Sequence, residues 1–256
     1  MESTLNLSQK YELRGYTVFF DIRDGLAAEN LLDSLDRGTA IFKQVFNVDS
    51  EPSAKFYILN TIKDAEAVLR NNGCVINNPS VDSISDSIFI MKDEINEINI
   101  GRVGLRELGR MYFDRIMGET EIKMRHKRTP TWLKEGLILQ AAFKYNRDNT
   151  DDLTYGWNLL LDANKKNQLV KPALLDNDLT PVSDENRRQL AIYQSFYMVH
   201  FLLNTYCDSF FSRYSTLMKV IDYMEAETCF RQITSFDFEK FFAMFESWVG
   251  KNKALA

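Results

Sequence analysis

Arg106, Glu107 and Arg110 are the residues of this chain whose types and spacing point most directly to chemistry. Side chains four positions apart lie on the same face of a helix, so Arg106 and Arg110 are expected to point the same way, with Glu107 beside them. Guanidinium groups bind carboxylates and phosphates through paired hydrogen bonds, and a glutamate with a tuned pKa acts as a general base. The alternative interpretation is a surface helix with ordinary ion pairs between successive turns.

Two segments further along the chain add residues of the same kind. Residues 130–137 read P-T-W-L-K-E-G-L, in which the proline is typical of a helix start and Glu135 follows Glu107 by 28 positions (135 minus 107). Residues 191–202 read A-I-Y-Q-S-F-Y-M-V-H-F-L and place Tyr193 and Tyr197 on one predicted helix. These tyrosines have two interpretations, an apolar helix face and polar groups lining a cleft.

In this order, the three segments and Trp248 resemble the peptidase-MA-like family, part of the gluzincin superfamily of zinc peptidases, over roughly residues 16–251. In that family a helix carries H-E-x-x-H, whose histidines share one face and bind zinc while the glutamate polarises a zinc-bound water. The resemblance implies a degenerate, zincin-like domain in which Arg106, Arg110 and Glu135 stand at the ligand positions.

The resemblance also implies roles for residues beside the metal position. Glu107 corresponds to the general base, and Tyr193 or Tyr197 corresponds to the tyrosine that steadies the developing oxyanion. The chain departs from the family at the ligands, because arginine has no available lone pair and a pKa above about 12, and therefore does not bind zinc. The two histidines of the sequence, His126 and His200, lie elsewhere. We therefore predict no metal and no cofactor.

The summed charge of the candidate site suggests which groups stand at the position of the family's metal. In the parent site Zn²⁺ faces two glutamates and neutral histidines, so the local charges cancel. In this chain Arg106 and Arg110 oppose two carboxylates, and the charges cancel again. Glu107 and Glu135 supply those carboxylates. We hypothesise that the guanidinium groups stand in for the charge of the metal, with Asp114 as a further partner of Arg110.

Composition narrows the class of protein. The 256 residues are 45% hydrophobic and 26% charged with a net charge of -5, which is typical of a globular protein and gives no reason to expect nucleic acid binding. The basic run at residues 123–128 is interpreted as a solvated loop, with a patch for an anionic partner as the alternative. The chain shows no signal-peptide pattern and no stretch as long as a membrane span, so we expect no membrane association. Three cysteines without metal spacing are typical of reduced thiols in a cytoplasmic protein.

Hydrophobic periodicity predicts an α+β fold. A small N-terminal mixed sheet with helices, residues 1–102, is expected to pack on a mostly helical C-terminal part, residues 103–256, that carries the candidate site. The predicted strands span residues 16–22, 55–59 and 87–91. The predicted helices span residues 26–46, 61–69, 105–117, 131–145, 153–164, 186–206, 210–226 and 236–249.

The sequence therefore predicts a metal-free pseudo-metallopeptidase used for binding, scaffolding or regulation, with an anionic small molecule, a peptide or a protein as its partner. The alternative is an enzyme with a repurposed, non-zinc cleft. In that case Arg106 and Arg110 would hold an anionic small molecule or peptide, and Glu107 and Glu135 would supply the carboxylates. A working zinc peptidase would need ligands that this sequence lacks at the family's positions.

Overall fold

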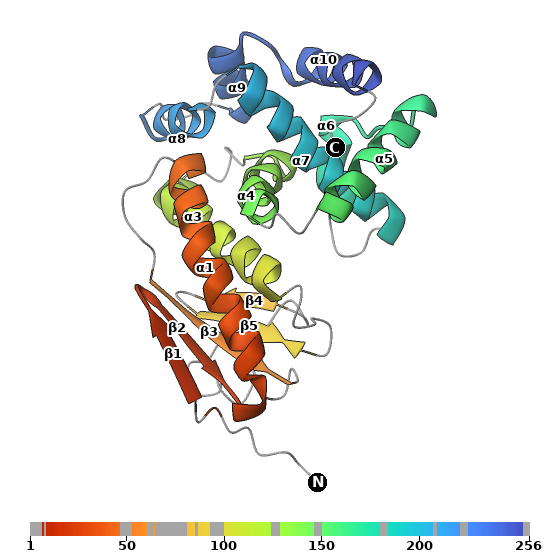
Figure 1. Ribbon diagram of the computed structural model, residues 1–256. Helices are drawn as coiled ribbons and strands as arrows, with labels where there is room; N and C mark the ends of the chain where they lie inside the picture. Colours follow the sequence, from red (N-terminus) through yellow and green to blue (C-terminus); the bar gives the residue numbers. More distant parts are fainter. Residues whose placement is uncertain are drawn as a thin grey trace. The chain divides into compact units, whose positions relative to one another are not determined.

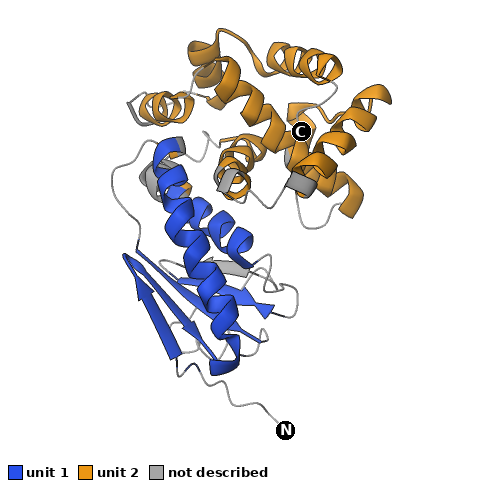
Figure 2. Ribbon diagram, viewed as in Figure 1, with its two compact units in different colours: residues 1–44, 48–112 blue, residues 45–47, 113–256 orange. Residues whose placement is uncertain are grey.

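The chain folds into two compact units (Figures 1 and 2). The computed structural model describes residues 7, 9–46, 53–60, 64, 81–84, 87–92, 100–123, 129–145, 150–179, 184–206, 209–220 and 225–252. Unit 1 comprises residues 1–44 and 48–112, and unit 2 comprises residues 45–47 and 113–256. The change from unit 1 to unit 2 falls inside one helix, between Tyr112 and Phe113, whereas the boundary predicted from the sequence lies ten positions earlier, at 102/103 (112 minus 102).

Unit 1 is built on a mixed five-stranded sheet with the strand order β1-β2-β3-β5-β4. The three inner strands are parallel, and the two edge strands pair with them antiparallel. The strands are β1 (Gln9–Leu13), β2 (Tyr16–Phe20), β3 (Ala54–Leu59), β4 (Val81–Ile84) and β5 (Ser87–Met91). A two-residue turn joins β1 to β2, and Arg14 adopts there the left-handed conformation (φ 53°) that tight hairpins require.

Aromatic residues link the inner strands of the sheet. Phe19, Tyr57 and Phe89 stand opposite one another in the strand register, with ring centroids 4.9 Å and 5.1 Å apart. On the other face, the Tyr16 and Phe56 rings meet edge to face at 6.2 Å. Such cross-strand pairs fix the register, because a slip by one residue would send each ring to the opposite face.

Two helices cover the face of the sheet that carries Tyr16 and Phe56 (Figure 1). They are α1 (Gly25–Phe46), which follows the short helix η1 (Ile22–Asp24), and the first half of α3 (Ile100–Lys123). The Tyr16 hydroxyl is hydrogen-bonded to Thr39 of α1 at 2.7 Å. The two helices approach closely because Gly38 of α1 accommodates Leu105, while Gly104 of α3 accommodates Leu31.

Unit 2 is helical in all the elements that the structure describes. Besides the second half of α3, it contains the helices α4 (Thr131–Tyr145), α5 (Thr150–Lys165), α6 (Pro172–Asp178), α7 (Glu185–Thr205), α8 (Phe210–Val220), α9 (Ala226–Thr234) and α10 (Phe238–Lys251). Helix α7 is central and contacts α4, α5, α6 and α10. The closest approach is between α4 and α7, where Gly136 faces the Ser195 carbonyl and the Gln140 amide donates to the Phe196 carbonyl at 2.7 Å.

The predicted α+β class is confirmed, as are the strands at 55–59 and 87–91 and the helices that correspond to α1, α3, α4, α5, α7 and α10. The strand predicted at 16–22 is present but ends at Phe20, because Ile22 begins η1. The prediction of one helix over residues 210–226 is wrong. Helix α8 ends at Val220, and Glu225 is extended at the start of α9. This break lets α9 fold back so that Phe230 packs on Phe210, with ring centroids 5.6 Å apart.

Five described elements were not predicted: the strands β1 and β4, the short helix η1, and the helices α6 and α9. The helix predicted at residues 61–69 lies outside the described residues except for Asp64, which is helical. None of the helices in the described part of the chain combines the length and the apolar character needed to cross a membrane.

The contact between α4 and α7 predicts a strong effect for Gly136→Ala. A Cβ at this position would lie 2.4 Å from the Ser195 carbonyl oxygen, which belongs to the backbone and does not give way. We expect the free energy of unfolding to fall by about 2 kcal/mol, measured by chemical denaturation. Gly250→Ala is the control within the same unit, because its nearest neighbour is the end of the flexible Asn164 side chain at 3.3 Å. Equal stability of the two variants would contradict the close packing of α4 on α7.

Candidate functional site

Arg106, Glu107 and Arg110 lie on α3, within unit 1. Glu107 is 4% exposed, and its carboxylate accepts a hydrogen bond from the Arg110 guanidinium one turn further along the helix. The Arg110 side chain is 26% exposed, so the pair spans the boundary between the interior and the solvent. A carboxylate this deeply buried is costly to ionise alone, and the guanidinium offsets that cost.

Arg106 lies on the same helix and is half-buried. Arg110 directs its guanidinium to Glu107, three residues before it. The sequence also predicted an ion pair between Arg110 and Asp114. The Asp114 side chain lies outside the part of the chain that the structure describes. The ion pair between Arg110 and Glu107 joins residues that share one turn of helix.

Glu135, the fourth member of the predicted set, lies on α4 and belongs to unit 2. It is 7% exposed. The predicted set is thus divided between the two units. Within α4, Trp132, Leu133 and Leu137 are fully buried, and Gly136 permits the approach of α7. Packing within unit 2 accounts for these positions of the P-T-W-L-K-E-G-L segment.

Both predicted tyrosines lie where α7 packs against α5. The Tyr197 hydroxyl donates to the Leu153 carbonyl of α5 at 2.8 Å. The Tyr193 ring lies 5.9 Å from the Tyr155 ring, and Gly156 leaves room for it. Burial, with a smaller contribution from Tyr193, raises the pKa of Tyr197 well above its ordinary value of 10.0. This phenol therefore acts as a hydrogen-bond donor in the contact between the two helices.

The remaining candidate ligands are dispersed. His200 is half-buried on α7, where its Nε2 atom lies 2.9 Å from the Asn204 amide and its ring lies 6.1 Å from that of Phe196. Cys229 is a buried free thiol whose Sγ lies 3.7 Å from the Tyr214 carbonyl oxygen. His126 lies outside the described residues. Among the residues that are described, no three His, Cys, Asp or Glu side chains are grouped in a way that could hold a metal ion.

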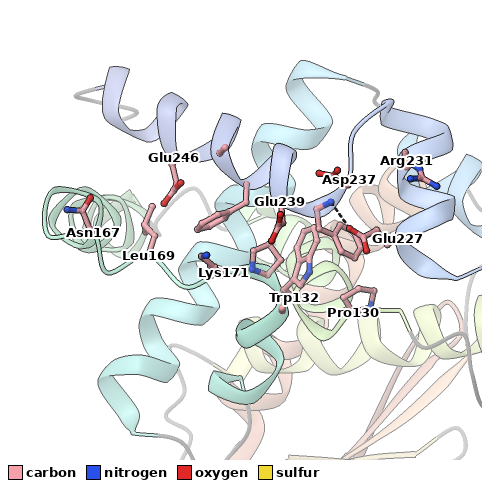
Figure 3. A pocket seen from close by; sticks show the side chains of 15 residues that line it. Pro130, Trp132, Asn167, Leu169, Lys171, Glu227, Arg231, Asp237, Glu239 and Glu246 are labelled. Atoms are coloured by element: carbon pink, nitrogen blue, oxygen red, sulfur yellow. Dashed lines mark hydrogen bonds between the residues drawn. The ribbon is translucent and has the colours of Figure 1, made fainter.

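A groove of about 900 Å³ opens on unit 2, and it was not predicted from the sequence. It lies within the size range of ligand pockets. Figure 3 shows its lining side chains spread from Asn167 and Glu246 at one end to Glu227 and Arg231 at the other. The apolar part of the lining includes Trp132, Leu169, Pro172, Phe238, Phe242 and Ala243. Of the three segments with candidate site residues, at 106–110, 130–137 and 191–202, only residues 130–137 contribute to the lining, through Pro130 and Trp132.

No family model, no curated protein and no solved structure matches this chain. The resemblance to the peptidase-MA-like family accordingly stays a hypothesis that rests on the sequence segments themselves.

The buried pair on α3 predicts strong coupling between Glu107 and Arg110. Arg110→Met should lower the free energy of unfolding by about 2 kcal/mol, because the buried carboxylate loses its counter-charge. The double variant Glu107→Gln/Arg110→Met should recover most of that loss. Glu185 and Arg188 form a matched control pair with the same spacing on the surface of α7, with side chains 63% and 36% exposed. Their coupling should stay below about 0.5 kcal/mol. Similar coupling energies for the two pairs would contradict the prediction that the buried pair on α3 is the stronger one.

The raised pKa of Tyr197 predicts how stability changes in alkaline solution. Below about pH 10 the phenol is protonated in both the folded and the unfolded state, and its contribution is complete. Above that pH the unfolded state loses the proton while the folded state keeps it, so the free energy of unfolding falls as the pH rises. Tyr197→Phe should make this fall less steep in denaturation experiments between about pH 9 and about pH 11. Tyr155→Phe, at an exposed position of α5, should keep the slope of the unmodified protein.

Proposed function

We propose that this chain is a metal-free, zincin-like domain, a pseudo-metallopeptidase of the peptidase-MA-like type, that works by binding a partner for scaffolding or regulation. The observation that carries the proposal is the ion pair between Arg110 and the buried carboxylate of Glu107. This contact sets a fixed positive charge beside Glu107, the residue that the resemblance aligns with the family's general base.

The ion pair favours binding over chemistry for two reasons. A general base must accept a proton from a reacting group, yet an adjacent guanidinium stabilises the ionised carboxylate and weakens it as a base. The same contact engages the Arg110 guanidinium, the group that a repurposed enzyme would use to hold an anionic substrate. The two groups thus neutralise each other on one turn of α3. We also propose a cytoplasmic location, as expected from reduced cysteines. Cys229 is a free thiol, which agrees with that proposal.

A zinc titration tests the origin of the domain. The variant Arg106→His/Arg110→His restores the H-E-x-x-H pattern, so it should bind one zinc ion per chain in calorimetric titration, whereas the unmodified protein should bind none at that affinity.

The control for this titration uses the same spacing one turn earlier. Arg102→His/Arg106→His also places two histidines four positions apart on α3, but without Glu107 between them. It should bind zinc at least about tenfold more weakly, because its histidines lie one turn away from the ligand positions of the family pattern. A folded Arg106→His/Arg110→His variant that takes up no more zinc than this control would show that the family alignment is wrong.

A further inference from the structure

The groove on unit 2 has one wall made by the connection between α5 and α6. Helix α5 ends in a Schellman motif, in which Asn167 adopts the left-handed conformation (φ 54°) and the Gln168 amide donates to the Ala163 carbonyl at 2.8 Å. Next along the chain, Val170 is held by the buried Gln194 side chain through two hydrogen bonds of 2.9 Å and 2.5 Å. These bonds fix the backbone between Asn167 and Lys171, so this wall of the groove is preformed.

The opposite wall is one face of α10. Glu239, Phe242, Ala243 and Glu246 all line the groove, and their spacing of three, four and seven positions places them on a single helical stripe. Asp237 caps the first turn of α10 by accepting the Lys240 amide at 2.7 Å. The stripe therefore offers an apolar centre with a carboxylate on either side.

Aromatic packing holds the floor of the groove. The Trp132 ring is fully buried, with its centroid 5.6 Å from that of Phe238 and 6.1 Å from that of Phe241. Phe230 of α9 joins the same cluster, 5.0 Å from Phe238. Because these rings come from α4, α9 and α10, the floor is part of the core of unit 2, and the groove does not depend on one mobile side chain.

The charges that line the groove are predominantly negative. The acidic lining residues are Glu227, Asp237, Glu239 and Glu246, against two basic ones, Lys171 and Arg231, so the net charge is −2 (two positive minus four negative). Glu227 accepts the Phe238 amide at 3.0 Å and Asp237 caps α10, so both are used by the fold. Glu239 and Glu246 form no ion pair with any residue that the structure describes.

We propose that this groove binds a short cationic peptide segment whose apolar side chains enter between Glu239 and Glu246 while its lysines or arginines pair with these two carboxylates. The two glutamates are seven positions apart on α10, which corresponds to about 10 Å along the helix. Basic residues seven apart on a helical ligand, or three apart on an extended one, match this distance. Apolar anchors flanked by complementary charge are a common mode of peptide recognition.

This inference rests on the proposed function in one respect, since it takes binding to be the task of the domain. Beyond that function, it names the groove as the binding surface and a cationic peptide as the partner. The groove and its charges belong to unit 2 alone and do not involve the α3 ion pair, so peptide binding and the zinc titration succeed or fail independently.

The experiment selects peptides of about 12 residues from a random displayed library against the full chain and measures their affinity by fluorescence anisotropy. Selected peptides should be enriched in lysine and arginine next to leucine or aromatic residues. Glu239→Gln/Glu246→Gln should weaken their binding about tenfold, and Lys171→Gln/Arg231→Gln, which removes the two lining cations, should strengthen it. Raising the salt concentration from about 0.05 M to about 0.5 M should reduce the affinity of the unmodified protein.

Two further variants make the result specific to the groove. Asp162→Asn/Glu185→Gln changes the net charge of unit 2 by the same amount at exposed carboxylates outside the groove, and should keep the original affinity. Ala243→Arg places a cation in the groove at an exposed position and should abolish binding without unfolding the protein, as checked by circular dichroism. The proposal is overturned if no peptide is selected, if selected peptides are neutral or acidic, or if the groove variants and the control bind alike.

Discussion

Unit 2 depends on how closely the backbone of α4 approaches that of α7. Gly136 makes this approach feasible, because any side chain there would collide with the Ser195 carbonyl. Around this point α7 sends polar side chains to its neighbours: Gln194 holds the connection between α5 and α6, and Tyr197 holds α5. A single small residue thus sets the position of the central helix, and the central helix then positions the segments around it.

The same contact determines the shape of the groove. Trp132 precedes Gly136 by one turn of α4, so fixing α4 against α7 also fixes the ring on which α9 and α10 pack. The aromatic cluster uses the apolar faces of these helices, while the exposed stripe of α10 keeps Glu239 and Glu246 at the edge of the groove. A rigid apolar floor with charged edges is suited to recognition, since little conformational entropy is lost when a ligand binds.

The ion pair on α3 joins two residue types that often take part in catalysis. Glu107 is buried, and the Arg110 guanidinium supplies a positive charge one turn further along the helix. Such a partner offsets the cost of keeping a carboxylate in the interior, so the pair contributes to the stability of the helix and its surroundings.

The sequence by itself determined the features that depend on neighbours within a few positions. Apolar periodicity located the three inner strands and the helix α4, and the bounds of β5 and α4 agree with those predicted. The spacing of Glu107 and Arg110 anticipated an ion pair. Edge strand β1 escaped prediction because its exposed Q-K-Y-E-L pattern lacks an apolar face. Only the tertiary structure decided the break between α8 and α9, the role of Tyr197 in helix packing, and the groove, whose lining extends from Pro130 to Glu246. These features depend on which helix faces pack against each other and which stay open, and no local pattern of residues specifies that choice.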